Sequence, residues 1–281
     1  MSGGLSATGL GGFDRPVVMI GCGTMAGAIL SRWLECGLKA DRVTVVDPGR
    51  SVPPAAGVTL LSALPDELHA RSVIVLGIKP QLLGEVAPSL ASLLETDEKI
   101  VISMLAGVTV GRLRAALGAG ADMIRIMPNT PVALGKGVCA LYADERTGDG
   151  AVETATELLA PLGLVERIAD EDQYNLVTAL TGCGPAFLFR FIDALAQGAA
   201  SLGLDAAQAQ RFAIAMVDGA AALASQAEEA PGVLADKVAS KGGMTREGLD
   251  VLDDGQRLDR LILDTLRAAR DRGEVLEKLS A

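Results

Sequence analysis

The chain has few of the residues on which metal sites and acid–base catalysis usually depend. It has one histidine, His69, and four cysteines, Cys22, Cys36, Cys139 and Cys183, none of which stands in a CxxC pair. A zinc site would have to be assembled from unsuitable ligands, so we predict no metal. Unpaired thiols are typical of a reducing compartment, which favours a cytoplasmic location. Because His69 stands apart from the motifs described below, we expect it on the surface.

Positive charge is also in deficit. The chain has 25 Lys and Arg against 35 Asp and Glu, a net charge of −10, and a pI near 4.7. This balance argues against nucleic acid or an anionic membrane as the main partner, because both present negative phosphates. Residues 1–14 lack the basic start and long apolar core of a signal peptide, and we interpret them as a flexible tail. We expect no apolar run long enough to cross a bilayer.

Apolar residues, in contrast, are abundant. They make up 49% of the 281 residues, which supports a large core and, at this length, two domains. In residues 15–169, short β-branched runs alternate with helical spacing, which predicts an α/β domain with a parallel, doubly wound, Rossmann-like sheet. The predicted strands cover residues 16–20, 42–46, 72–78, 99–104 and 123–126, with 137–142 and 164–169 as extensions. The predicted helices cover residues 24–36, 81–94 and 151–159.

A glycine turn joins the first predicted strand to the first predicted helix. After Ile20, the segment Gly21-Cys22-Gly23-Thr24-Met25-Ala26 has the pattern GxGxxA. Gly21 permits a tight turn, Gly23 lets a pyrophosphate approach the backbone, and Ala26 keeps the helix close to the sheet. We predict that residues 20–25 bind a dinucleotide. A tight turn that binds nothing is the alternative.

The end of the second predicted strand carries conflicting signals about the coenzyme. Asp47 stands about twenty residues after the turn, where a carboxylate would bond the ribose hydroxyls of NAD. Arg50 follows, and its guanidinium would suit the extra phosphate of NADP, although it would also suit a solvated loop. The choice between the two coenzymes therefore stays open at this point.

Further candidates follow other strands of the predicted sheet. Lys79 and Pro80 come after Ile78, and Ala106 and Gly107 follow the next strand. Ligands of open α/β folds bind at this carboxyl edge, so we predict coenzyme contacts at these positions. In the segment 125–131, two prolines stiffen the loop around Asn129, which we interpret as a rigid floor beneath the nicotinamide. A plain structural turn is the rival interpretation.

The second half, residues 170–281, is predicted to be a helical domain. Predicted helices cover residues 172–179, 185–202, 206–226 and 232–238, with two more toward the C-terminus. Small residues along these helices permit close helix approach, and the apolar surface is large for a lone bundle, so we predict dimerisation through it. Packing within one chain is the alternative.

Two further glycine turns stand before helices in this half. Thr181-Gly182-Cys183-Gly184-Pro185 opens the run 187–202. Pro185 suits a first helical turn, and the glycines are expected to leave the helix-start amides bare for a ligand; a close helix crossing would look the same. The second turn is Ser240-Lys241-Gly242-Gly243-Met244-Thr245. Bare amides at residues 243–245 would form a cradle for a carboxylate, although a capped loop has a similar sequence.

Taken in order, these motifs resemble the pyrroline-5-carboxylate reductase family, which completes proline biosynthesis. The resemblance runs from about Pro16 to the C-terminal helices. Residues 181–186 resemble the family's SGSGPA and residues 240–245 its SPGGTT. The further segments that carry the resemblance are 20–25, 78–81, 101–107 and 127–131.

The resemblance implies a Rossmann domain followed by a helical dimerisation domain, and homodimers that often assemble further, commonly into decamers. It implies reduction of the cyclic imino acid 1-pyrroline-5-carboxylate to L-proline by NADP(H), with NAD(H) as the alternative. By the same analogy, Thr245 is catalytic and bonds the ring nitrogen. Ser240, Gly242, Gly243, Met244 and Thr245 hold the substrate, with Glu171 close to it. Lys237 approaches the coenzyme.

Three departures from the family pattern bear on the site. Lys241 replaces a proline, Met244 replaces a small residue, and Leu64 stands where some relatives have an asparagine near the coenzyme. The rival enzyme class is the β-hydroxyacid dehydrogenases, which need a lysine and, a turn later, an asparagine that the helix after the turn at residues 182–184 lacks. A nucleotide sensor without turnover is the alternative from a different class.

Overall fold

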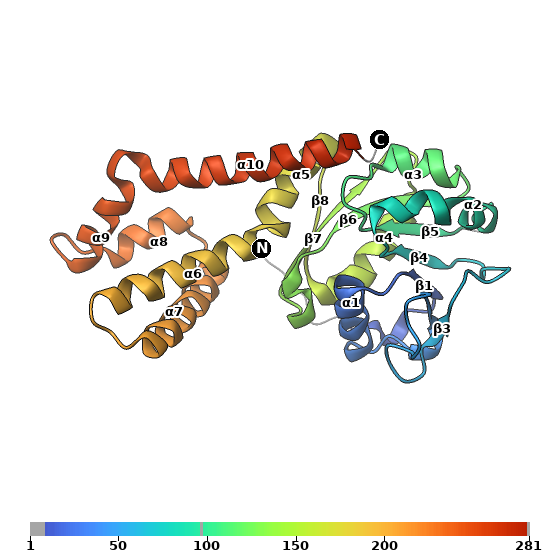
Figure 1. The fold of residues 1–281 in the computed structure, drawn as a ribbon, viewed down its shortest axis with the longest axis horizontal. Helices are drawn as coiled ribbons and strands as arrows, with labels where there is room; N and C mark the ends of the chain where they lie inside the picture. Colours follow the sequence, from blue (N-terminus) through green and yellow to red (C-terminus); the bar gives the residue numbers. More distant parts are fainter. Residues whose placement is uncertain (1–8, 96–97, 280–281) are drawn as a thin grey trace. The chain divides into compact units, whose positions relative to one another are not determined.

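The computed structural model describes residues 9–95 and 98–279, which divide into two compact units (Figure 1). Unit 1 contains the chain up to residue 182 together with the chain from residue 270, and unit 2 contains residues 183–269. The predicted boundary was at residue 169/170. The structure instead groups the helical residues 171–182 and the end of the last helix with the sheet.

Unit 1 is built on a sheet in the order β3-β2-β1-β4-β5-β6-β7-β8. The strands are β1 (Val17–Ile20), β2 (Val43–Val46), β3 (Thr59–Leu61), β4 (Val73–Leu76), β5 (Ile100–Ser103), β6 (Asp122–Met127), β7 (Gly137–Ala143) and β8 (Gly163–Arg167). All neighbouring pairs are parallel except β6 with β7. The prediction of a fully parallel sheet is corrected at this pair, because the short connection 128–136 returns the chain beside β6 and a parallel neighbour needs a longer crossover.

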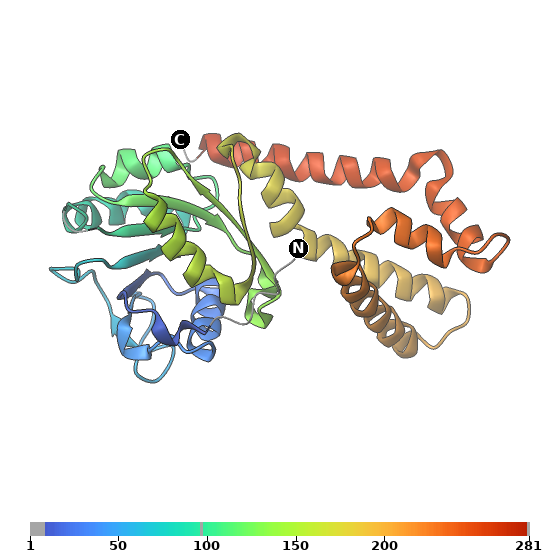
Figure 2. The same cartoon turned by 180° about the vertical axis from the view of Figure 1, so that it is seen from behind.

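Helices cover both faces of this sheet. Successive side chains of a strand point to opposite faces, so Val17 and Met19 of β1 pack in one core and Val18 and Ile20 in the other. The first core includes α1 (Thr24–Glu35) and α4 (Asp149–Leu159), and α4 lies in front of the strands in Figure 2. The second core includes α2 (Leu83–Leu93) and α3 (Val110–Leu117). The predicted Rossmann-like fold of the N-terminal region is confirmed.

The N-terminal segment is less free than the sequence indicated. Residues 1–8 of the predicted flexible tail lie outside the described residues. Leu10–Gly12 form a 3-10 turn, and the side chains of Leu10 and Phe13 are only 1% and 5% exposed. The prediction of a flexible tail is therefore wrong for residues 10–13, whose apolar side chains join the first core.

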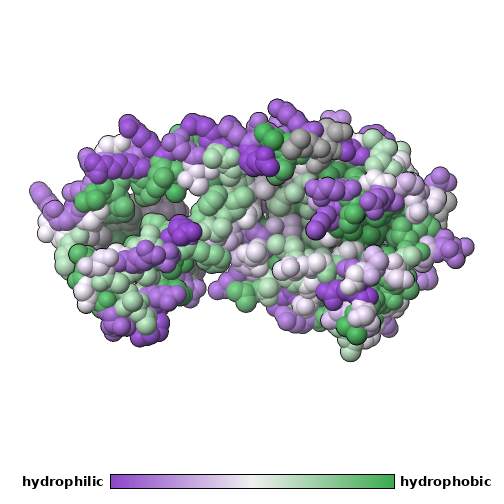
Figure 3. Space-filling model, in the orientation of Figure 1, coloured by the Kyte–Doolittle hydropathy of each residue, from purple (hydrophilic) through white to green (hydrophobic). Residues whose placement is uncertain are grey.

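Unit 2 is entirely helical within the described chain. It contains α6 (Gly184–Ser201), α7 (Ala206–Gln226), α8 (Pro231–Val238), α9 (Met244–Asp253) and α10 (Arg257–Leu279) up to residue 269. Its buried cluster is small and consists of Ala196, Ala209 and Ala213. Large apolar side chains are exposed instead, including Phe189 at 64% and Phe212 at 57%. Figure 3 shows apolar surface over this helical part of the chain.

One helical stretch, Glu171–Ser201, is long and apolar enough by length and composition to cross a membrane. The expectation that no such run exists is therefore wrong. Only 11% of its most apolar window is buried within the chain. The sequence underestimated this stretch because α5 (Tyr174–Val177) continues through a π-helical segment, Thr178–Gly182, toward α6.

Candidate functional site

The turn between β1 and α1 is shaped by two glycines with different tasks. Gly21 has a φ of +83°, and a Cβ there would lie 2.9 Å from the carbonyl oxygen of Gly77, so a larger residue would be strained. A Cβ on Gly23 would instead point into open space. Gly23 is the N-cap of α1 and no side chain caps the helix. The first amides of α1 are thus left for a ligand, which suits a pyrophosphate.

Two cavities meet at this turn, at the carboxyl ends of the parallel strands. The larger has a volume of about 790 Å³ and the smaller about 260 Å³, and both are lined by Gly23, Gly77 and Ile78. Of the predicted coenzyme residues, Ile20, Gly21, Cys22, Gly23, Asp47 and Ile78 line the larger cavity, and Thr24 and Met25 line the smaller. This end-to-end arrangement suits the two halves of a dinucleotide.

Several residues that line these cavities were not among the predicted coenzyme contacts, although Leu64 and the segment 125–131 were expected near the coenzyme. The larger cavity includes residues 62–66, with Leu64, and the smaller includes Met104, Met127 and Pro128. The signal was available for Met104 and Met127, because each stands at the end of a predicted strand. Residues 62–66 follow β3, a three-residue edge strand that the sequence did not reveal.

Asp47 and Arg50 are both bonded to the glycine turn. One oxygen of Asp47 accepts the amide of Cys22 at 2.9 Å, and the other accepts the amide of Gly49 at 2.9 Å. Arg50 donates from Nη2 to the Cys22 carbonyl at 2.9 Å. Burial raises the pKa of the Cys22 thiol, so it stays neutral near pH 7. Both side chains therefore lie beside the glycine turn, and Asp47 also lines the larger cavity.

The remaining predicted coenzyme residues of unit 1 do not line either cavity. Lys79 is exposed and Pro80 begins a 3-10 turn. Ala106 is exposed, whereas Gly107 is buried against the backbone of Leu276. The side chain of Asn129 is taken up by the protein: Nδ2 donates to the Thr181 carbonyl at 2.9 Å and Oδ1 accepts the Val138 amide at 2.8 Å. Asn129 thus fixes the loop 128–136, and a coenzyme contact would fall to its backbone.

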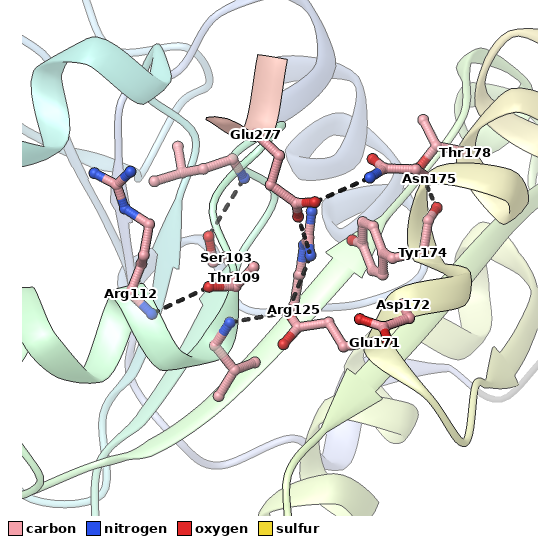
Figure 4. Close-up of polar contacts among 12 residues, drawn as sticks. Ser103, Thr109, Arg112, Arg125, Glu171, Asp172, Tyr174, Asn175, Thr178 and Glu277 are labelled. Atoms are coloured by element: carbon pink, nitrogen blue, oxygen red, sulfur yellow. Dashed lines mark hydrogen bonds and ion pairs between the residues drawn. The ribbon is translucent and has the colours of Figure 1, made fainter. Parts of the chain in front are cut away.

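Glu171 belongs to a buried ionic cluster (Figure 4). Its Oε1 lies 3.0 Å from Nη1 of Arg125, a side chain only 1% exposed on β6, and the same Nη1 lies 3.3 Å from Oε1 of Glu277. The guanidinium stacks on the ring of Tyr174 at 3.6 Å. No ionic role was predicted for Arg125 or Glu277. A charged residue within an otherwise apolar strand was the available signal for Arg125.

In unit 2, the turn before α9 matches the predicted cradle of amides only in part. The Gly243 amide donates to the Ser240 carbonyl at 3.0 Å, so it is not bare as expected. Gly242 has a φ of +71°, and a Cβ on Gly243 would overlap Oγ of Ser240. Gly243 is the N-cap of α9, without a side-chain cap, and the side chains of Met244, at 93%, and Thr245 are exposed. Lys237 forms an ion pair with Glu229.

The turn at residues 181–185 differs from the expectation of bare helix-start amides. The preceding residues form the π-helical segment rather than an open loop, and Ala186 and Phe187 donate to the carbonyl of Cys183 at 3.0 and 3.4 Å. Pro185 does occupy the first turn of α6. The Phe187 bond is the ordinary first bond of the helix, whereas the Ala186 amide is a helix-start amide that was expected to be free and is bonded.

Comparison with known proteins decides the family. A family model for pyrroline-5-carboxylate reductase dimerisation matches residues 171–276, and one for NADP oxidoreductase, coenzyme F420-dependent, matches residues 16–107. The chain is 30% identical over 273 residues to the pyrroline-5-carboxylate reductase of Pasteurella multocida, covering 94% of this chain and 98% of that protein. The chain belongs to the pyrroline-5-carboxylate reductase family. The predicted family is thereby confirmed.

Other members of the family agree. The pyrroline-5-carboxylate reductase of Synechocystis sp. is 34% identical over 265 residues, covering 92% of this chain and 97% of that protein. The solved pyrroline-5-carboxylate reductase of Coxiella burnetii superposes with a TM-score of 0.84 at 30% identity, covering 93% and 98% of the two chains. The Plasmodium falciparum enzyme, solved with NADP bound, shares the fold with a TM-score of 0.79 at 22% identity, covering 94% and 98%.

Proposed function

We propose that this chain reduces 1-pyrroline-5-carboxylate to L-proline with NADPH or NADH as the hydride donor. The observation that carries the proposal is the pair of cavities at the glycine turn, in a chain that matches pyrroline-5-carboxylate reductases over more than nine-tenths of its length. The NADP oxidoreductase match over residues 16–107 supports NADP(H) as the coenzyme.

The residues at the turn fit a dinucleotide. Gly23 leaves space where a side chain would stand, and the uncapped amides of α1 favour a pyrophosphate. Asp47 and Arg50 lie at the adenosine end, beside Cys22. Met104 and Met127 line the smaller cavity, whose apolar walls suit a nicotinamide ring. The bound coenzyme supplies a hydride; the protein supplies position and exclusion of water.

The proposed chemistry suits a chain with one exposed histidine. A C=N bond protonated on nitrogen already accepts hydride at carbon, so the protein needs mainly to align the reacting atoms and to hold the substrate carboxylate. The uncapped amides of Met244 and Thr245 are proposed to bind that carboxylate, and the Gly243 amide would join them by giving up its bond to the Ser240 carbonyl. The Thr245 hydroxyl, or water, is proposed to bond the ring nitrogen and deliver its proton. Ser240, Gly242 and Glu171 stay proposed substrate residues.

Assembly is part of the proposal. The exposed apolar side chains of α6 and α7 lie in the region matched by the dimerisation model, so we propose that a second copy covers them in a homodimer, which assembles further into larger oligomers such as decamers. The same covering explains the apolar stretch Glu171–Ser201 without a membrane. We propose a cytoplasmic location and a coenzyme contact for Lys237.

The direct test is an assay of coenzyme oxidation with 1-pyrroline-5-carboxylate as substrate and proline as the measured product. Matched reactions with simple 2-ketoacids and 3-oxoacids, which also accept hydride from the reduced coenzyme, serve as controls. We expect turnover with the cyclic imine alone, whereas the β-hydroxyacid dehydrogenase class predicts the opposite ranking. Folded protein that binds the coenzyme but forms no proline would favour a sensor. In sedimentation at low micromolar concentration, a monomer would contradict the proposed assembly.

A further inference from the structure

The last turns of α10 are built into unit 1 by two glycines far apart in sequence. Gly107, with a φ of +72°, stands in the loop after β5, and a Cβ there would lie 3.3 Å from the backbone of Leu276 and Glu277. Gly273 lies within α10, where glycine lowers helix stability by about 1 kcal/mol relative to alanine. A Cβ at Gly273 would lie 2.8 Å from Oδ1 of Asn175. Gly107 therefore makes room for the backbone of α10, and Gly273 makes room for the Asn175 side chain.

Charge completes this contact. Glu277 offers Oε1 to Arg125 at 3.3 Å and accepts Nδ2 of Asn175 on Oε2 at 3.0 Å. Arg125 is buried on β6 and also holds Glu171 at 3.0 Å. We call the four residues Arg125, Glu171, Asn175 and Glu277 the C-terminal clamp (Figure 4). All four belong to unit 1.

The clamp acts on the loop 104–109, which joins β5 to α3. The same Oε1 of Glu171 that meets Arg125 accepts the amide of Val110, the first residue of α3, at 2.9 Å. The opposite side of the loop contacts α10 at Gly107. Both ends of the clamp, Glu171 and α10, therefore restrain this loop.

This loop borders the proposed coenzyme site. Its first residue, Met104, lines the smaller cavity together with Met127, two residues after Arg125 on β6. A shift of the loop would move one wall of the cavity that is assigned to the nicotinamide. Displacements of about 1 Å at such a wall change rates up to about 100-fold.

We propose that the C-terminal clamp positions the loop 104–109 against the coenzyme, and that Arg125 and Glu277 are positioning residues for hydride transfer. The last turns of the chain thus contribute to coenzyme binding without touching it. The clamp's role toward the coenzyme rests on the proposed function, whereas its effect on the order of the loop 104–109 does not.

The decisive variant is Glu277→Gln, which keeps the side chain's shape and removes its charge. Its matched control is Glu274→Gln, one turn earlier on α10, where Glu274 is 50% exposed and pairs only with exposed Arg270 among the described residues. Glu171→Gln is the second variant, because its amide oxygen still accepts the Val110 amide while the charge is lost. Arg125→Lys tests whether a positive charge alone restores function.

Two readouts separate positioning from general stability. Hydrogen exchange of residues 104–110 is measured in coenzyme-free protein, and we expect about 3- to 10-fold faster exchange in Glu277→Gln than in Glu274→Gln. Dissociation constants for NADPH and NADH, measured by fluorescence, are expected to rise by a similar factor, with KM for the coenzyme rising more than kcat falls. We expect Arg125→Lys to lie between wild type and Glu277→Gln.

The outcomes are distinguishable. The clamp is overturned as a positioning device if exchange in the loop is unchanged. It is also overturned if the melting temperature falls while coenzyme affinity of the folded fraction is unchanged. Neither result contradicts the proposed reductase function. A wild-type protein that binds neither dinucleotide overturns the proposed function and the clamp's role toward the coenzyme together. Faster exchange with weakened binding in Glu277→Gln and Glu171→Gln, but not in Glu274→Gln, supports the proposal.

Discussion

The glycine turns before α1 and α9 lie in very different surroundings. The turn at Gly21 and Gly23 is enclosed by the sheet, whose strand ends form the two cavities beside it. The turn at Gly242 and Gly243 offers similar uncapped amides, but Met244 beside it is 93% exposed. The same local chemistry therefore gives a walled site in unit 1 and an open one in unit 2.

The difference follows from the cores of the two units. Unit 1 has strands buried on both faces, so its loops at the carboxyl edge rest on a fixed frame. Unit 2 buries little beyond three alanines and leaves large apolar side chains exposed. We therefore propose that the turn at Gly242 and Gly243 gains its walls from a partner copy. This agrees with the proposed homodimer, in which the coenzyme end is built within unit 1 and the acid-binding end needs assembly.

The largest effect is expected at the open turn, from Thr245→Ala. Loss of the hydroxyl removes the group proposed to serve the ring nitrogen, and we expect kcat to fall about 100-fold or more. Coenzyme affinity should stay within a factor of two, roughly, because the change leaves the walled turn of unit 1 intact. Steady-state kinetics and coenzyme titration check both values. Thr245→Ser should restore most of the rate, and equal losses of rate and coenzyme binding would contradict the assigned role.

The next effect compares the two glycines of the walled turn. In Gly23→Val the side chain would enter the open space between the amides and the cavity, so we expect coenzyme affinity to fall about 100-fold with less than about 1 kcal/mol of lost stability. In Gly21→Val the strained φ and the contact with Gly77 should cost about 1–3 kcal/mol of stability as well. Thermal unfolding and coenzyme titration separate the two variants. Identical behaviour would mean that Gly23, too, is only structural.

The glycine turn beside the two cavities was largely predictable from the sequence, whereas the exposed position of the turn before α9 was not. Ile20 to Met25 follow a strand in a fixed motif, so their place at the sheet edge follows from local geometry. The helix α3 was missed although Thr109 caps it and Val110, Leu113 and Leu117 are its buried residues at helical spacing. The segment is only eight residues long, and it reads as a loop because glycine and two arginines interrupt the apolar pattern.

The clamp around Arg125 was beyond the sequence for a different reason. Glu171 and Glu277 stand 46 and 152 residues from Arg125 along the chain, and nothing local indicates that they share one guanidinium. The same holds for the side chain of Asn129, whose bonds to the backbone at Val138 and Thr181 nothing in the local sequence indicates. Contacts of this kind depend on how β6, the π-helical segment and α10 pack, which periodicity does not specify.

A smaller effect tests how the walled turn selects its coenzyme. Arg50→Ala should weaken NADPH relative to NADH by about 3- to 10-fold, because a half-exposed guanidinium near a phosphate is partly screened by solvent. The ratio of kcat/KM values for the two coenzymes measures the effect. Arg71→Ala removes an exposed arginine elsewhere in unit 1 and should leave the ratio unchanged. An unchanged ratio in Arg50→Ala would leave Arg50 only the structural role of bonding the Cys22 carbonyl.

The smallest effect concerns the rigid core that supports the walled turn. Burial raises the pKa of the Cys139 thiol on β7 to about 12 from 9.0. Below about pH 8 the thiol is neutral in both states and has no effect on the pH dependence of stability. Above pH 9 the unfolded chain releases the proton and the folded chain keeps it, so stability falls as pH rises from about 9 to 12. At pH 9.5 this loss is about 0.8 kcal/mol.

Cys139→Ala should therefore show a flatter decline of unfolding free energy between pH 8 and pH 10 than the wild type, whatever it costs at neutral pH. Denaturant unfolding at several pH values measures the difference in slope. Cys36→Ala, at a partly exposed position, serves as the matched thiol control. Parallel slopes for wild type and Cys139→Ala would show that water reaches the Cys139 thiol on β7 in the folded state. The core of unit 1 would then exclude water less completely than its buried strands indicate, and the two units would differ less than described.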